Sequence, residues 1–342
     1  MSFSDRRRGV AVLVVLLAAV LGGCSSGGTP SSPSISAAPS PSASASEAAA
    51  SPSPSPTPAF PVTVTDDEGT SVELPAEPKK IVSLTPATTE ILFALGAGDR
   101  VVATDDGSDY PEKAAALPDV ATFSSVDVEK VVALSPDLVV AGGLGFTPAE
   151  SITKLRDLKV PVVVIYAPSV DGVLKDIELL GRATGTSADA ESLTQAMRAD
   201  MDAVSSAVAS QSPKPRTFYD VGYDDTTGAI YAPADDSFLA EMVTMAGGDA
   251  ITTGDPNTYE IPLEKLIEKD PQLIVLGTNP FYSPTPDAVA KRRGWDAFTA
   301  VRNGDIRPVN DIEITRPGPR LPMGLRTLAS AIWPDVAIPA AP

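Results

Sequence analysis

The sequence predicts an α/β protein of two similar lobes with Rossmann-like parallel sheets, joined by one long spine helix. Short β-rich runs alternate with helical periods after residue 79, which is typical of parallel βα units. The stretch VEKVVALSPDLVVAG (128–142) recurs as LEKLIEKDPQLIVLG (263–277), with Glu, Lys, Pro, Leu, Val and Gly in register. Between the two halves, residues 187–211 contain neither Gly nor Pro. The repeat therefore indicates two copies of one unit, and the uninterrupted stretch indicates their connection.

Residues 1–23 are predicted to be an export signal outside the fold. Three arginines, Arg6 to Arg8, precede an apolar run that is too short to span a bilayer. The run ends in LGGC, which is similar to the site at which a bacterial lipoprotein is cleaved and its cysteine is lipidated. We therefore expect a lipid on Cys24 that holds the exported protein at the outer face of the cytoplasmic membrane. The alternative is a buried cysteine that follows an export signal.

Residues 24–60 are predicted to be a disordered tether. From Ser25 to Pro58 the chain consists mainly of Ser, Pro and Ala, with Glu47 as its one charge and no aromatic residue. Such a segment buries too little apolar surface to offset the entropy of ordering. At about 3.1 Å per residue it reaches roughly 100 Å when fully extended. The globular part is therefore expected to stand away from the membrane.

The composition excludes several classes of function. The net charge is −18, and −20 without the three arginines and one aspartate of the predicted signal. This charge argues against nucleic acid and against adhesion to anionic lipid. The chain has no histidine, and Cys24 is its one cysteine. Catalytic sites of the Ser-His-Asp or Cys-His type and metal capture by imidazole are therefore excluded, and we expect neither a metal site nor a resident cofactor.

The first lobe is predicted over residues 79–168. Its strands are expected at 80–84, 100–105, 137–142 and 160–166, and its helices at 88–96, at 127–135 and from Thr147 onward. Asp127 occupies an N-cap position, where a carboxylate accepts from free backbone N–H groups. Thr147, followed by Pro148 and Glu150, forms the pattern of a capping box.

The connection is predicted over residues 169–215 and the second lobe over residues 216–338. A helix over residues 187–211 would be about 37 Å long, which suits a spine between two lobes. The alternative is a long surface helix of a single domain. Strands of the second lobe are expected at 216–222, 271–277 and 305–310, and helices at 237–248, 263–270 and 320–332.

Three motifs carry a resemblance to a known family: the Ser-Leu-x-Pro-x-x-Thr-Glu turn at residues 83–90, the tripeptide Asp109-Tyr110-Pro111, and the helix that precedes PDLV at residues 136–139. Over residues 79–338 the chain resembles the binding proteins of iron-siderophore and cobalamin importers. The resemblance implies a monomeric, non-enzymatic receptor that delivers a corrinoid or a ferric siderophore to an ABC-transporter permease with its cytoplasmic ATPase. An enzyme or a cell-surface adhesin on the same scaffold is the alternative.

The resemblance also implies ligand contacts where strand ends of the two lobes face each other. They fall on Asp105, Asp106, Phe123, Gly143, Tyr223, Tyr231, Tyr259, Arg316 and Arg320. Positions with large aromatic residues in the cobalamin branch fall on Gly107, Gly142 and Thr258. The Asp-Tyr-Pro motif favours cobalamin, whereas a thinner aromatic lining with nearby acids would suit a ferric siderophore. The sequence leaves the ligand open between these two.

Glu129 and Glu264 occupy the same place in the repeat. In the cobalamin branch, which the chain resembles, one Glu on each lobe enters an arginine pocket of the permease. The resemblance therefore implies a docking role for both residues. The alternative is structural, because a Glu in the first turn of a helix interacts favourably with the helix dipole by about 0.3–1 kcal/mol.

Overall fold

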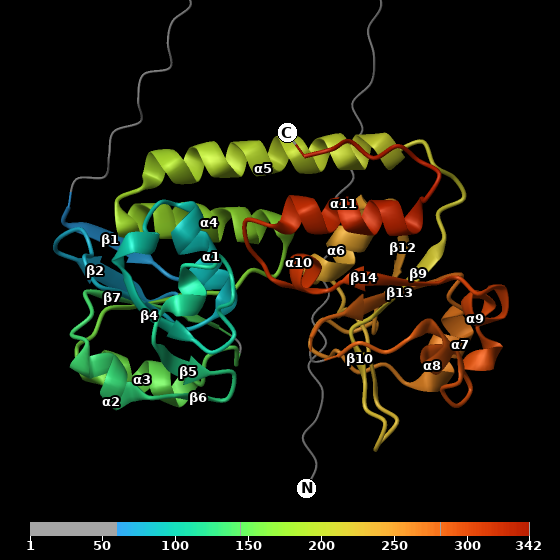
Figure 1. Ribbon diagram of the computed structural model, residues 1–342, viewed down its shortest axis with the longest axis horizontal. Coiled ribbons are helices and arrows are strands. Elements are labelled where there is room, and N and C mark those ends of the chain that lie inside the picture. Colours follow the sequence, from blue (N-terminus) through green and yellow to red (C-terminus); the bar gives the residue numbers. More distant parts are fainter. Residues whose placement is uncertain (1–59, 144, 281, 342) are drawn as a thin grey trace, which may run out of the picture. The chain divides into compact units, whose positions relative to one another are not determined.

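The computed structural model describes residues 60–143, 145–280 and 282–341 (Figure 1). The predicted export signal, the predicted lipidation site at Cys24 and all of the predicted tether except Phe60 lie outside these residues. Within the described part of the chain, no helix combines the length and the apolar character needed to cross a membrane.

The first lobe is built on a six-stranded sheet with the order β6-β5-β4-β3-β7-β8. The strands are β3 (Ile81–Ser83), β4 (Val101–Asp105), β5 (Asp119–Thr122), β6 (Ser125–Val126), β7 (Leu138–Gly142) and β8 (Val162–Ile165). All neighbours pair in parallel except β5 and β6. Every residue of β7 and β8 is buried, because helices cover both faces of the sheet.

Four helices cover this sheet. They are α1 (Pro86–Ala94), α2 (Val128–Ala133), α3 (Ala149–Asp157) and α4 (Val170–Thr184). Side chains of α1 and α4 pack with one set of strand residues, and side chains of α2 and α3 pack with the other set. The hairpin of β1 (Val62–Thr65) and β2 (Ser71–Leu74) contacts α4. Short 3₁₀ turns lie at Gly98–Arg100 and Ala114–Ala116.

The second lobe repeats the arrangement with a parallel sheet of order β12-β9-β13-β14. The strands are β9 (Arg216–Asp220), β12 (Asp249–Ile251), β13 (Leu273–Thr278) and β14 (Ile306–Asn310), with a hairpin of β10 (Gly222–Tyr223) and β11 (Ile230–Tyr231). The helices are α6 (Phe238–Met245), α7 (Leu263–Lys269), α8 (Pro286–Ala290), α9 (Thr299–Asn303), α10 (Ile312–Thr315) and α11 (Leu321–Ile332), with a 3₁₀ turn at Trp295–Ala297.

The order β12-β9-β13-β14 matches β4-β3-β7-β8 strand for strand in chain order. The duplicated sequence is α2 followed by β7 in one lobe and α7 followed by β13 in the other. Both copies supply a helix and then a strand at the same place in the sheet. The sequence repeat is thus a repeat of structure.

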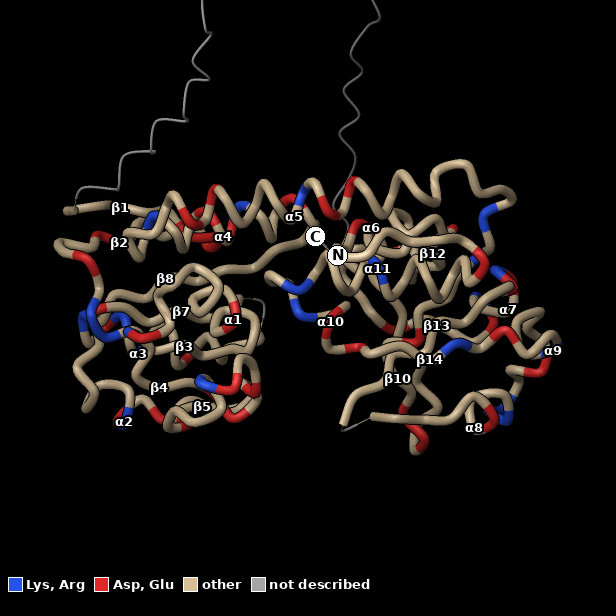
Figure 2. Tube along the Cα trace, turned by 45° about the horizontal axis from the view of Figure 1, so that its top comes forward, with Lys and Arg blue, Asp and Glu red and all other residues tan. Residues whose placement is uncertain are grey.

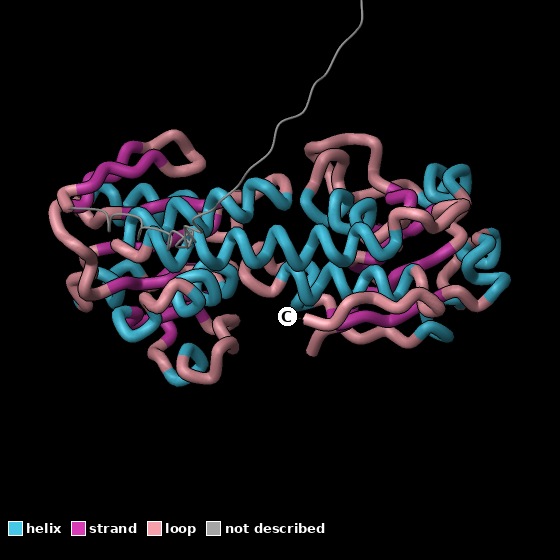
Figure 3. Tube along the Cα trace, turned by 90° about the horizontal axis from the view of Figure 1, so that it is seen from above, coloured by secondary structure: helices cyan, strands magenta, loops and turns pink. Residues whose placement is uncertain are grey.

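A single helix, α5 (Ser187–Val208), connects the lobes and packs against α4 of the first and α11 of the second (Figures 1 and 3). Its buried residues recur every three or four positions and therefore form one face. They are Ala190, Thr194, Met197, Met201, Val204 and Val208. One hydrophobic cluster runs through α4, α5 and α11. The predicted class, two α/β lobes joined by a spine helix, is confirmed.

Three local expectations need correction. The predicted capping box is wrong, because the Thr147 hydroxyl accepts from the Gly142 N–H at 3.1 Å and Glu150 pairs with Lys154 at 2.7 Å. Pro148 is the N-cap of α3 instead. The helix predicted to reach residue 211 ends at Val208. Neither the β1–β2 hairpin nor α4 was expected as an element.

Candidate functional site

A cavity of about 290 Å³ lies where strand ends of the first lobe meet loops of the second. The first lobe contributes Thr85, Pro86, Ala87, Thr88, Phe123, Gly142, Phe146, Ile165, Tyr166, Ala167 and Asp176. The second contributes Phe238, Tyr259, Thr315, Arg316 and Pro317. Most of the first set follow β3, β5, β7 or β8 directly, because the carboxyl ends of parallel strands share one edge of a sheet.

Five aromatic side chains line this cavity: Phe123, Phe146, Tyr166, Phe238 and Tyr259. Three of them are held open to solvent, with 75% of Phe123, 52% of Phe146 and 47% of Tyr259 exposed. Phe146 and Tyr166 stack with ring centroids 6.5 Å apart. Exposed aromatic surface gathered in one concave place is typical of a ligand site.

Glycine at position 142 makes room for this lining. A Cβ atom there would lie 2.9 Å from both the Phe146 Cβ and the Thr85 Cγ2. The aromatic residues come from neighbouring positions instead, chiefly Phe146 and Tyr166. Phe146 and Tyr166 therefore supply aromatic surface beside Gly142, and the ligand stays open between cobalamin and a ferric siderophore.

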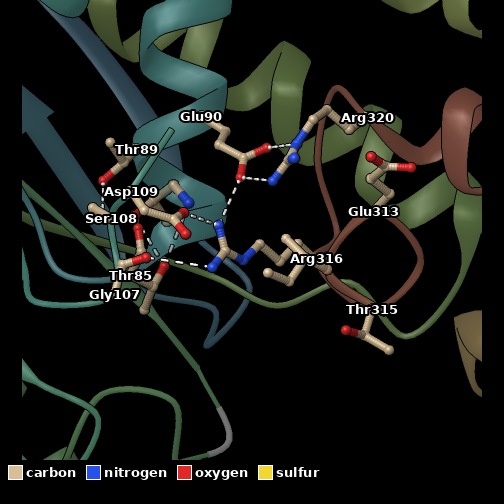
Figure 4. A network of polar contacts seen from close by, with 12 residues as sticks. Thr85, Thr89, Glu90, Gly107, Ser108, Asp109, Glu313, Thr315, Arg316 and Arg320 are labelled. Carbon is tan, nitrogen blue, oxygen red and sulfur yellow. Dashed lines mark hydrogen bonds and ion pairs between the residues drawn. The ribbon is translucent and has the colours of Figure 1, made fainter. Parts of the chain in front are cut away.

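An ion-pair network joins the lobes at the edge of the cavity (Figure 4). Glu90 of α1 is buried and accepts from Arg320 Nε at 2.8 Å and Nη2 at 2.6 Å. Arg316 Nη1 donates to Glu90 Oε1 at 3.2 Å and to Asp109 Oδ1 at 2.7 Å. Burial would lower the pKa of Arg320, but the hydrogen bond and charge of Glu90 outweigh this and raise it. The two arginines thus bind carboxylates of the opposite lobe.

The other predicted contacts of the first lobe are not part of the cavity lining. Gly143 donates to the Ile165 carbonyl at 2.9 Å and packs near Tyr166. Asp105 is buried and accepts from Ser108 Oγ at 2.5 Å and from the Gly107 N–H at 3.1 Å. Burial raises the pKa of Asp105. Asp106 is exposed. Of the first-lobe predictions, Phe123 alone lines the cavity directly.

Two of the three predicted tyrosines of the second lobe lie outside the lining. Tyr223 packs edge-on against Trp295, and the Arg292 guanidinium lies 4.3 Å from its ring centroid. Tyr231 is partly exposed on β11. Arg292 is engaged by the buried Asp220 at 2.6 Å. Tyr223 is therefore part of a packed cluster within its own lobe, and of these tyrosines Tyr259 alone reaches the cavity.

Asp176 of α4 is a cavity residue that sequence reasoning missed. Its exposed fraction is 6%, and the Asp67 carboxylate lies within hydrogen-bonding reach. Burial, followed by the charge of Asp67, raises the pKa of Asp176 to about 8. Asp67 is itself held by the Tyr166 N–H at 2.5 Å. The sequence did carry one indication of this residue: Asp176 stands three positions after Val173, on the apolar face of a helical pattern.

The cavity also holds a tyrosine whose ionisation is suppressed. Burial, and then the neighbouring Tyr259, raise the pKa of Tyr166 to about 12. Tyr166 therefore stays neutral at physiological pH. Within the described part of the chain, no three His, Cys, Asp or Glu residues are close enough to hold a metal ion.

Glu129 and Glu264 lie in the first turns of α2 and α7 and are exposed. Neither has an ion-pair partner among residues 60–143, 145–280 and 282–341. The adjacent lysines are engaged elsewhere, since Lys130 pairs with Asp127 at 3.4 Å and Lys265 donates to the Thr253 carbonyl. The two carboxylates are therefore left available.

The chain was compared with known protein families and with curated proteins. A family model described as periplasmic binding protein matches residues 81–311. The chain is 31% identical over 334 residues to the uncharacterized ABC transporter substrate-binding lipoprotein YvrC of Bacillus subtilis, covering 96% of this chain and 98% of that protein. It is 30% identical over 282 residues to a cobalamin-binding protein of Halobacterium salinarum, covering 80% of this chain and 74% of that protein.

A solved structure agrees with the sequence relatives. It is described as an ABC-type Fe3+-hydroxamate transport system from Saccharomonospora viridis, with a TM-score of 0.64 and 26% identity. The match covers 80% of this chain and all of that one. The family match across both lobes, the spine helix and these relatives show that this chain belongs to the periplasmic binding protein family of ABC transporters.

Proposed function

We propose that the protein is an extracytoplasmic, lipid-anchored receptor of an ABC importer that captures a corrinoid or a ferric siderophore between its lobes. The observation that carries the proposal is the cavity at the strand ends, with five aromatic side chains and three of them exposed. Aromatic faces bind large, partly apolar ligands at a low cost in side-chain entropy. Relatives named for cobalamin and for Fe3+-hydroxamate transport support the same ligand classes.

The alternative, an enzyme or an adhesin on this scaffold, lacks a comparable observation. The sequence has no histidine, and its one cysteine is Cys24. Two of the buried acids are bound to arginines, since Glu90 joins the lobes and Asp220 binds Arg292. The site therefore favours binding over catalysis.

For docking, we infer that Glu129 and Glu264 are contacts to the permease. Neither has an ion-pair partner in the described part of the chain, and they occupy equivalent places in the two lobes. Each shares its helix face with an aliphatic side chain three residues later. These are Val132, 37% exposed, and Ile267, 39% exposed. A carboxylate beside an aliphatic residue fits an arginine whose charged head is paired and whose methylene stem is covered.

For the anchor, we infer that a lipid on Cys24 retains a monomer at the membrane and that the Ser/Pro-rich segment lets it reach the permease. The relative named as a lipoprotein, aligned over nearly the full length of both chains, supports this. Labelling cells with a lipid precursor would show incorporation that Cys24→Ser abolishes. Equal incorporation into both forms would contradict the anchor.

Binding is the decisive test. The chain without its export signal, carrying Cys24→Ser, would be titrated with cobalamins and with ferric siderophores while thermal stability and ligand absorbance are followed. A ligand at 100 times its dissociation constant should stabilise the folded state by about 2.7 kcal/mol. The absence of any stabilisation across both ligand classes would contradict the proposed function.

A further inference from the structure

The positively charged side chains at the cavity are already paired with carboxylates. Arg316 is the one Lys or Arg in the described cavity lining. Its guanidinium binds Glu90 and Asp109, and Arg320 binds Glu90 through two nitrogens (Figure 4). Two cations therefore face two carboxylates, and the network as a whole carries no net charge.

The rest of the described cavity lining adds no positive charge. Its titratable groups are Asp176 and the two tyrosines, Tyr166 and Tyr259. Asp67, in the turn that follows β1, is the charged group in contact with Asp176. Burial, followed by the charge of Asp67, raises the pKa of Asp176 to about 8, and the pair adds no positive charge to the cavity. The nearby α6 contributes Glu241, which accepts from the Val170 N–H at 2.7 Å.

Binding of an anionic ligand would be unfavourable in this cavity. A buried charge needs a partner of opposite sign, and Arg316 is already engaged by two carboxylates. The ligand would also approach a chain of net charge −18, whose Asp and Glu residues lie on both lobes (Figure 2). Both effects disfavour negative charge on the ligand.

We propose that the cavity selects ligands without net negative charge: metal chelates whose donor groups neutralise the metal and whose outer surface presents uncharged amide or hydroxamate oxygens. The aromatic walls cover the faces of such a chelate. The inference rests on the proposed function and narrows it, since it places anionic tricatecholate siderophores outside the specificity of the cavity.

The test uses two ferric siderophores that differ mainly in charge. A neutral ferric trihydroxamate and a trianionic ferric tricatecholate would be titrated calorimetrically into the mature chain carrying Cys24→Ser, with cyanocobalamin as a second uncharged probe. We expect an uncharged probe to bind at least about 100-fold more tightly than the tricatecholate. Tighter binding of the tricatecholate would overturn the charge selection but leave the receptor proposal intact. No binding of any probe would instead overturn the receptor proposal.

A variant tests whether the pairing of Arg316 with carboxylates causes the discrimination against anionic ligands. Asp109→Asn removes one carboxylate from Arg316, and Asp109 is exposed, so the fold should tolerate the change. The ratio of the tricatecholate Kd to the neutral-probe Kd should then fall by about tenfold, because Arg316 gains a free donor for an anion. Asp202→Asn, at an exposed position on α5, is the control with the same change in net charge. An unchanged ratio in Asp109→Asn, or an equal fall in Asp202→Asn, would overturn the proposal.

Discussion

The two lobes share one strand order but differ in what their strand ends carry. In the first lobe the segments after β5, β7 and β8 present Phe123, Phe146 and Tyr166 to the cavity. In the second lobe the ends of β9 and β14 carry acids that are bound within the same lobe. Asp220 pairs with Arg292 at 2.6 Å, and Asp311 accepts from the Tyr219 hydroxyl at 2.7 Å.

The comparison teaches that duplication determines the scaffold but not the chemistry. The helix-strand repeat keeps the sheet order and an exposed Glu in both lobes. The loops at the strand ends have diverged, because loops tolerate change without loss of the core. The first lobe therefore supplies most of the cavity lining, and the second contributes Arg316 and Arg320 to the network between them.

The largest expected effect tests the equivalence of the lobes. Changing Glu129 and Glu264 together to Ala should reduce ligand uptake by cells to background while ligand affinity and stability stay nearly unchanged, since exposed unpaired carboxylates contribute little to folding. Uptake by each single variant should lie between that of the double variant and that of the unchanged protein. Uptake of labelled ligand measures this, with Glu268→Ala on α7 as the matched control. Normal transport by the double variant would show that the repeat reflects duplication alone.

A smaller effect is expected where the lobes meet. Glu90→Gln should lower the free energy of unfolding by about 3 kcal/mol, because Arg320 and Arg316 lose a buried carboxylate that both contact. Urea unfolding at pH 7 measures the change. Glu77→Gln affects a half-exposed ion pair with Arg100 inside the first lobe and should cost far less. Equal losses in the two variants would contradict a special role for Glu90.

The expectation that the first lobe provides most of the ligand contacts can be tested directly. Phe146→Ala should weaken the affinity for the ligand found in the binding screen by about tenfold, since aromatic contacts in a cavity contribute about 1–2 kcal/mol. Stability should change little, because half of the side chain is already in solvent. Titration checks the affinity. Met323→Ala, which removes an exposed apolar side chain of α11, should leave it unchanged.

The effect that depends on pH concerns the acid pair of the first lobe. The pKa of Asp176 is about 8 in the folded chain and should be near 4 when unfolded. Between these values the folded state keeps a proton that the unfolded state has lost, so stability decreases as pH rises from about 4 to about 8. Asp176→Asn should remove this decrease.

Thermal unfolding from pH 4 to pH 9 measures this difference. The gain of Asp176→Asn over the unchanged protein should be largest at pH 9 and should vanish near pH 4. Asp189→Asn, at the exposed start of α5, should show no such trend. A constant offset across the whole range would contradict the raised pKa of Asp176.

Part of the site was predictable from the sequence and part was not. Phe123, Tyr259 and Arg316 were named from the resemblance, and all three line the cavity. Phe146 and Tyr166 were not named, because an aromatic residue after a strand has no pattern that separates a ligand contact from a packed side chain. Tyr223 was also named from the resemblance, but it lies outside the cavity lining and packs on Trp295.

The sequence by itself determined the class of fold, the duplication and the spine helix. These follow from local patterns: the period of apolar residues, the position of Gly and Pro, and the recurrence of fifteen residues. Only the tertiary structure decided that Arg316 and Arg320 bind Glu90 more than 200 positions away, and that Asp67 meets Asp176. Such contacts depend on how the strands and helices pack together, and local periodicity carries no information about that packing.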